Sequence, residues 1–239
     1  SASSRAIPVE KQLERVKENP AYPVSWPCEQ PGMSGGTELE GGDLEDAKLF
    51  YKFVHEKVWR EVDAYLKMHP EKSERLHKSV VNRFLEPFMW HTVLVSSTGW
   101  ENFRGLRCSP QAQPEMRLAA EKMMEALDAS TPTELDYGQW HMPFMDDLDE
   151  LAEIYHMMHL KMISAARCAR VSYLTHGTGV KDVQEDLRLA GQLQQGNPIH
   201  ASPFEHVARP LERGEIGDSN FWGWWQYRED IEFGIETKR

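Results

Sequence analysis

A long amphipathic stretch between Leu44 and His69 constrains the fold more than any other feature of the sequence. Its apolar residues recur at intervals of three and four, which places them on one face of an α-helix. These residues are Leu49, Phe50, Phe53, Val54, Val58, Val62 and Leu66. Pro70 ends the stretch, because proline has no amide hydrogen and clashes with the preceding turn. The sequence therefore predicts one long helix that buries a single face.

Shorter stretches with helical spacing are predicted on both sides of this helix. They cover residues 9–19, 76–85, 98–107, 111–129, 147–162 and 182–195. Thr98 and Glu101 have the spacing of a capping box at the start of one of these helices. Ser109 is a predicted N-cap, with Pro110 at the first position of the next helix. The proline- and glycine-rich residues 20–42 are expected to form a loop or lid.

Composition narrows the class of protein. A chain of 239 residues with 40% hydrophobic residues can bury a core as one large or two small domains. Its three cysteines are far apart, which argues against a disulfide framework or a zinc site and fits a reducing cytoplasm. No membrane-spanning run or signal peptide is evident, so we expect a soluble cytoplasmic protein, in the host cytoplasm if phage-encoded. The net charge of -11 disfavours nucleic-acid polymers but leaves small anionic ligands open.

Two motifs in the first half of the chain contain conspicuous arginines. Residues 81–87 read Val-Asn-Arg-Phe-Leu-Glu-Pro, and residues 101–107 read Glu-Asn-Phe-Arg-Gly-Leu-Arg, with Ala-Gln at 112–113. They resemble the Val-Ala-Arg-x-x-Leu-Pro and Asn-Phe-x-x-Leu-Arg segments of the flavin-dependent thymidylate synthases. The resemblance implies that Arg83 contacts the phosphate of dUMP from a neighbouring subunit. It also implies that Arg107 reaches the pyrimidine and acts in catalysis, and that Asn102 contacts the flavin.

The same motif also has a purely structural interpretation. Phe103 and Leu106 would be core residues, and Arg107 would be a surface charge near a helix C-terminus, where cations are favourable.

The first five residues, Ser-Ala-Ser-Ser-Arg, resemble the end of the family signature Arg-His-Arg-x-x-Ser-x-Asn-Glu-x-Ser-x-Arg-Tyr. In the family, this part of the signature forms a loop around the phosphate and base of the nucleotide. Small residues let backbone amides approach an oxyanion, and a guanidinium grips phosphate with two hydrogen bonds. The implied dUMP contacts are Ala2, Ser3, Ser4 and Arg5. A polar chain end with no role is the alternative.

A third motif lies in the second half of the chain. Residues 169–172 read Ala-Arg-Val-Ser, and residues 200–206 read His-Ala-Ser-Pro-Phe-Glu-His. Ser202, Pro203 and Glu205 together predict a capped helix start, whose free amides suit a phosphate. Both segments resemble the FAD-binding part of the same family. The implied FAD contacts are Ser172, His200, Ser202 and Glu205. A capping box without a ligand, beside a core histidine at 206, is the alternative.

The resemblance covers about two fifths of the chain, in permuted order, as in bacteriophage members of the family. The Arg-His-Arg half of the signature, which contacts the flavin, is absent. The first residue is a serine, the residue type that intein splicing requires immediately downstream of the splice junction. We therefore expect an upstream segment to join at Ser1 and to restore FAD binding and activity. Truncation of the chain is the alternative.

The helical spacing predicts a helix-rich chain, and the resemblance implies an α/β (α+β) fold in which helices flank a central twisted sheet. One catalytic domain would contain a ligand loop and lid (1–42), a helical nucleotide-binding part (43–129) and a flavin-binding part (147–239). The resemblance implies a homotetramer that methylates dUMP to dTMP with FAD, NADPH and methylenetetrahydrofolate. Two alternatives are kept. One is another flavin-dependent C5 modification of a pyrimidine nucleotide, and the other is an inactive or fragmentary homologue. The tryptophan-rich residues 220–228 are interpreted as packing or a subunit contact.

Overall fold

The computed structural model describes residues 4–32, 35–173, 175, 182–212, 214–216 and 221–234. It is mostly helical, which confirms the helix-rich part of the expected fold. The sheet found in these ranges has only two short antiparallel strands, so the expected central twisted sheet is not seen in them. The chain divides into two compact units. We call Ser3–His91 with Gly99–Thr131 the helical unit, and Pro132–Arg239 with Thr92–Thr98 the mixed unit.

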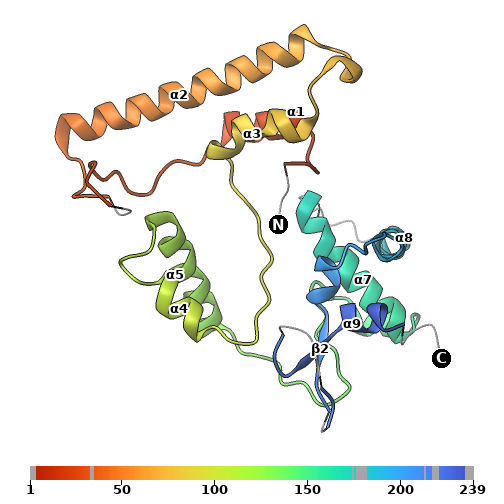
Figure 1. The fold of residues 1–239 in the computed structure, drawn as a ribbon. Helices are drawn as coiled ribbons and strands as arrows, with labels where there is room; N and C mark the ends of the chain where they lie inside the picture. Colours follow the sequence, from red (N-terminus) through yellow and green to blue (C-terminus); the bar gives the residue numbers. More distant parts are fainter. Residues whose placement is uncertain are drawn as a thin grey trace. The chain divides into compact units, whose positions relative to one another are not determined.

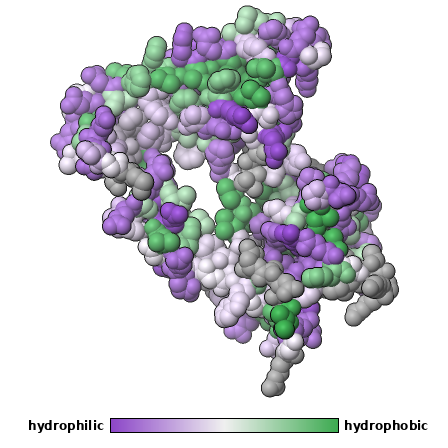
Figure 2. All heavy atoms as spheres, in the orientation of Figure 1, coloured by the Kyte–Doolittle hydropathy of each residue, from purple (hydrophilic) through white to green (hydrophobic). Residues whose placement is uncertain are grey.

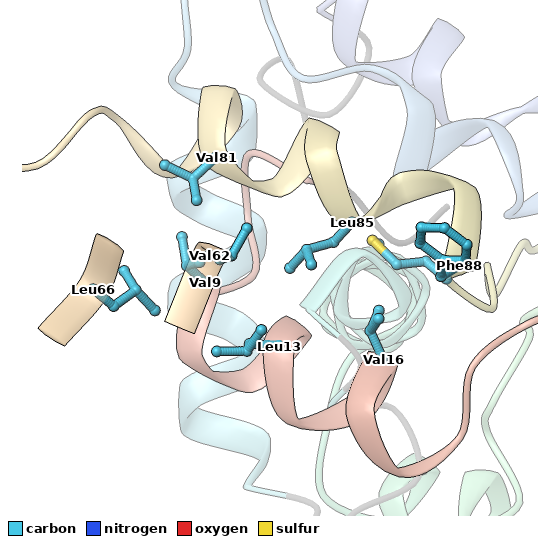
Figure 3. Close-up of a cluster of buried hydrophobic side chains, with 9 residues drawn as sticks. Val9, Leu13, Val16, Val62, Leu66, Val81, Leu85 and Phe88 are labelled. Atoms are coloured by element: carbon cyan, nitrogen blue, oxygen red, sulfur yellow. The ribbon is translucent and has the colours of Figure 1, made fainter. Parts of the chain in front are cut away.

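Three helices form the core of the helical unit: α1 (Val9–Glu18), α2 (Gly41–Met68) and α3 (Lys78–Leu85) (Figure 1). The short 3-10 helices η1 (Lys72–Glu74) and η2 (Glu86–Phe88) flank α3. Apolar side chains of α1, α2 and α3 meet in one buried cluster, together with two residues that follow α3 (Figure 3). Its members are Val9, Leu13, Val16, Val62, Leu66, Val81, Leu85, Phe88 and Met89. The predicted long helix is therefore confirmed, and its C-terminal half supplies Val62 and Leu66 to the buried cluster. The predicted burial of the whole apolar face is wrong for the N-terminal half, where Leu49, Phe50 and Phe53 are exposed.

The rest of the helical unit is a helical hairpin of α4 (Glu101–Arg107) and α5 (Pro114–Ala129). Two hydrogen bonds from the Arg104 guanidinium to the Asp128 carboxylate, at 3.0 and 2.5 Å, join the two helices. A bidentate pair of this kind fixes orientation as well as distance.

The mixed unit is built around α7 (Met157–Arg170), which is buried along most of its length. It packs against α8 (Val183–Gln194) and against the 3-10 helix η4 (Ser202–Glu205). The smaller elements are α6 (Leu148–Ala152), η3 (Val171–Tyr173), β1 (Ala208–Pro210), β2 (Trp224–Gln226) and α9 (Tyr227–Glu232). Strand β1 pairs with β2 in antiparallel register, with Arg209 opposite Trp225.

The single helix predicted for residues 147–162 is wrong, because the chain breaks between α6 and α7. Leu151 and Leu160 both belong to one buried cluster, with Met145 and Ile163. Nine residues of continuous α-helix would rotate Leu160 by roughly 180° from Leu151. The break lets both leucines enter the same core.

Two predicted helix caps are also wrong. Helix α5 begins at Pro114 and not at Gln111. A helix that began at Gln111 would contain Pro114, which clashes with the carbonyl four residues earlier, whereas Pro114 at the first position is well tolerated. Helix α4 begins after Trp100, where no side chain caps it, so Thr98 and Glu101 do not form the predicted capping box.

Helices α1 and α8 follow their predictions to within a residue at each end. The Asp182 carboxylate caps α8 by accepting hydrogen bonds from the amides of Gln184 and Glu185, at 2.9 and 3.2 Å. No helix in the described ranges has the length and apolar character needed to cross a membrane.

Candidate functional site

The N-terminal segment lies against α3 in the helical unit. The Nδ2 atom of Asn82 donates hydrogen bonds to the carbonyl oxygen of Ser4 at 2.7 Å and to that of Ile7 at 3.0 Å. Asn82 is fully buried, whereas Arg5 and Arg83, which follow Ser4 and Asn82 in the sequence, are exposed. The structure therefore brings two predicted dUMP residues, Ser4 and Arg5, to the helix that carries a third, Arg83.

A second contact holds the same segment. The Nζ atom of Lys78, one turn before Asn82 on α3, donates to the carbonyl oxygen of Ala6 at 2.9 Å. The contact thus places an ammonium against a short stretch of backbone. The two joined segments also carry Arg5 and Arg83, and ammonium and guanidinium groups are the residue types that favour a phosphate ligand. The other two residues predicted for this loop, Ala2 and Ser3, lie outside the described residues.

Helix α4 carries the predicted pyrimidine and flavin contacts of the helical unit. Asn102 and Arg107 are both exposed, and five residues of helix separate them by roughly 140° around the axis. They therefore point to different sides of α4. Leu106 is 57% exposed, so the alternative in which it is a core residue is wrong, while Phe103 is half-buried and packs edge-on against Trp100.

The predicted FAD segment lies in the mixed unit, where η4 begins after Ala201 without a side-chain cap. His200 and Ser202 are exposed on this segment. The capping box predicted for Ser202 and Glu205 is wrong, because the Glu205 carboxylate accepts a hydrogen bond from Arg228 instead. The η4 turn also buries Phe204 completely.

Arg228 lies in the tryptophan-rich segment, for which the sequence analysis predicted only packing or a subunit contact. Its guanidinium binds Glu205 and Glu232, and these hydrogen bonds raise its pKa. The sequence does contain a local signal for the start of α9, because Gln226 and Glu229 have the spacing of a capping box and form one in the structure. This cap fixes the orientation of the first helical turn, which carries Arg228. The Nε2 atom of Gln226 also donates to the carbonyl oxygen of Glu205 at 2.7 Å.

His206 follows η4 and is half-buried. Its Nδ1 atom lies 2.9 Å from the Oγ atom of Ser96. Burial lowers the pKa of His206, so the imidazole is kept neutral and can share this hydrogen bond. The interpretation of His206 as a packed, hydrogen-bonded histidine agrees with this geometry.

Ser172 lies in η3 and is half-buried. Arg170 of the same motif and Arg167, one turn earlier on α7, are structural, because the Nε atoms of Arg167 and Arg170 both donate to the Asp186 carboxylate, at 3.2 and 2.7 Å. Arg167 also binds Asp147 with two hydrogen bonds, at 2.5 and 2.9 Å. The Asp186 pairs tie α7 to α8, and the Asp147 pair ties α7 to the residue before α6. Ser172 is then the member of the motif whose proposed ligand role is to be tested.

Across the described ranges, no three His, Cys, Asp or Glu side chains are grouped so that they could hold a metal ion. Comparisons of the chain with known protein families, curated protein sequences and solved structures found no significant match.

Proposed function

We propose that the protein is a flavin-dependent thymidylate synthase, which converts dUMP to dTMP with methylenetetrahydrofolate, FAD and NADPH. One contact carries this proposal: the Asn82 amide binds the Ser4 carbonyl across 78 positions of sequence. It joins two motifs that were singled out separately as parts of a dUMP site.

The role of this site is to position and neutralise a nucleotide. Arg5 and Arg83 would bind the phosphate, with Ala2, Ser3 and Ser4 as backbone donors, and Arg107 would bind the carbonyl edge of the pyrimidine. Exposed guanidinium groups suit a site completed by a second subunit, because a neighbouring surface can exclude water from them. Orientation and electrostatic stabilisation of this kind supply a large share of catalytic rate enhancement.

FAD would be held by Ser172, His200, Ser202 and Glu205 of the mixed unit. An exposed hydroxyl at Ser202 and an exposed imidazole at His200 fit a diphosphate in chemical type, and Arg228 adds a guanidinium to the same segment. The flavin would supply the hydride transfer.

We expect the protein on its own to hold FAD weakly, so that after incubation with FAD and gel filtration a fraction of it keeps the visible absorption band of oxidised flavin. The double substitution Ser202→Ala with Glu205→Ala should release that flavin, since a hydroxyl contact and a carboxylate contact are lost together. Glu232→Ala is the matched control, because it breaks the other ion pair of Arg228 but leaves all proposed ligands. Equal flavin retention in the wild type and the double variant would move the FAD site elsewhere.

A homotetramer needs an apolar surface, and the helical unit has one along α2 and α3 (Figure 2). Leu49, Phe50 and Phe53 are each more than half exposed on α2. A groove of about 340 Å³ continues this surface, and it is lined by Lys57, Val58, Glu61, Val62, Tyr65, Leu76, Val81 and Phe84. Helices α2 and α3 together carry six acidic and seven basic side chains. A second copy of a chain with net charge -11 can approach this nearly neutral surface with little repulsion.

Replacing both Phe50 and Phe53 by aspartate should dissociate the assembly, because it places charge in the centre of an apolar interface. Sedimentation velocity is the measurement, and Lys52→Asp on the same helix is the control for added negative charge. A wild type that sediments as a monomer would contradict self-association through this surface.

A further inference from the structure

We propose that Asn82 is a positioning residue for the nucleotide: its buried amide holds the backbone of residues 4–7 on α3 and so sets Arg5 beside Arg83. This inference rests on the proposed function, because it assigns a residue to the same dUMP site.

The orientation of the Asn82 amide is fixed by its partners. Both groups within reach, the carbonyl oxygens of Ser4 and Ile7, are acceptors, so the atom that faces them must be the Nδ2 donor. Each of its two hydrogens is used by a different carbonyl. The two bonds span the backbone on both sides of Arg5 and Ala6, and they therefore restrict where the Arg5 side chain can begin.

The opposite end of the same side chain is unusual. The Oδ1 atom of Asn82 is buried and has no hydrogen-bond donor among the described residues. An unsatisfied buried acceptor destabilises a fold, and an apolar side chain would avoid it. The amide is therefore better explained by the loop that it holds than by the stability of the core.

Side chains of α3 make hydrogen bonds to this part of the backbone. Helix α1 begins after Pro8 without a side-chain cap, so α1 does not restrain residues 4–6 through its own cap. Ile7 is buried and anchors the end nearest α1. The earlier residues are held by side chains of α3, through Asn82 at Ser4 and through Lys78 at Ala6.

A control residue with matched chemistry exists in the same three-helix core. Gln12 on α1 is also fully buried, and its Nε2 atom donates to the sulfur of Met89 at 3.2 Å. Gln12→Ala removes a buried amide without touching residues 4–7. It separates loss of stability from loss of positioning.

The test combines calorimetric titration of dUMP with amide hydrogen exchange of the N-terminal peptide, in the full chain and in Asn82→Ala and Gln12→Ala. We expect Asn82→Ala to raise the Kd for dUMP about tenfold, the scale of one or two lost hydrogen bonds, and to speed exchange at residues 4–6. Gln12→Ala should leave both unchanged. Asn82→Ser keeps one donor and should be intermediate, and it serves as the test if Asn82→Ala does not fold.

The possible failures are distinguishable. Tight dUMP binding by the wild type with the same Kd in Asn82→Ala overturns the role of Asn82 and leaves the proposed function standing. An equal rise of Kd in Gln12→Ala also overturns it, because the effect would then be one of stability. Absence of dUMP binding by the wild type overturns the proposed function, and the positioning role falls with it.

Discussion

Replacing Lys161 by methionine is expected to lower the free energy of unfolding of the mixed unit by about 3–5 kcal/mol, the cost of breaking a buried ion pair. The Nζ atom of Lys161 lies 2.7 Å from Oδ2 of Asp230, and both residues are less than a tenth exposed. The substitution would leave the Asp230 carboxylate buried without its cation.

Both members of this ion pair make further contacts with aromatic side chains. Its ammonium lies 4.4 Å from the ring centroids of both Trp140 and Tyr227, at cation-π distance. The other oxygen of Asp230 accepts a hydrogen bond from Nε1 of Trp225 at 2.8 Å. The tryptophan-rich tail thus includes a packed part, in agreement with one of its two predicted roles, whereas Trp222 in the same tail is 88% exposed.

Denaturant unfolding followed by tryptophan fluorescence measures this effect, since two of the tryptophans report on the site. The control is the double variant Lys161→Met with Asp230→Asn, which removes both charges but keeps an acceptor for Trp225. It should recover most of the lost stability. A loss of less than about 1 kcal/mol in Lys161→Met would show that the pair is no more stabilising than a surface ion pair.

Arg167→Met is expected to lower the free energy of unfolding by about 3 kcal/mol or more, because one buried guanidinium serves several buried and half-buried acceptors. Besides Asp147 and Asp186, its Nη1 atom donates to the carbonyl oxygen of Phe144 at 2.9 Å. Phe144 has a φ of 61°, the left-handed region that costs energy for a residue with a side chain. Loss of the guanidinium would free this strained turn as well as the carboxylates.

Arg170→Met is the matched control, since Arg170 shares Asp186 but is more exposed. It should cost about 1 kcal/mol. Arg167→Lys should fall between the two, because an ammonium keeps the charge and loses the bidentate geometry. Thermal unfolding of the three variants under the same conditions ranks their losses of stability. Equal losses in Arg167→Met and Arg170→Met would mean that the Phe144 turn and Asp147 contribute little.

Helices of this fold could be predicted from the sequence where apolar residues recur at helical spacing. The stripe on α2 and the Asp182 cap of α8 are local signals, and both elements follow them. Cap predictions failed where two signals competed, as at Pro110 and Pro114, because the sequence does not show which proline begins the helix. The break between α6 and α7 is set by a shared core, which no local window contains.

In the candidate site, too, the sequence predicts what depends on local motifs and not what depends on contacts between distant segments. Motifs indicated Arg83 and Arg5, but the contact that joins them depends on Asn82 reaching a segment far away in sequence. Arg228 and Lys161 were missed for the same reason, since their partners Glu205 and Asp230 lie 23 and 69 positions away. Residue type can suggest a ligand at each position, but pairing across such distances is decided by the tertiary fold.

Calorimetric titration of dUMP and of deoxyuridine into the purified protein tests the central claim most directly, because the two ligands differ only in the phosphate. We predict that dUMP binds at least tenfold more tightly than deoxyuridine, and that Arg83→Ala and Arg107→Ala each weaken dUMP binding by about 1.5–3 kcal/mol, the value of a charge-assisted hydrogen bond. Arg83→Ala should also bring the two ligands closer in affinity. Equal affinity for dUMP and deoxyuridine in the wild type, or no binding of either, would contradict the account.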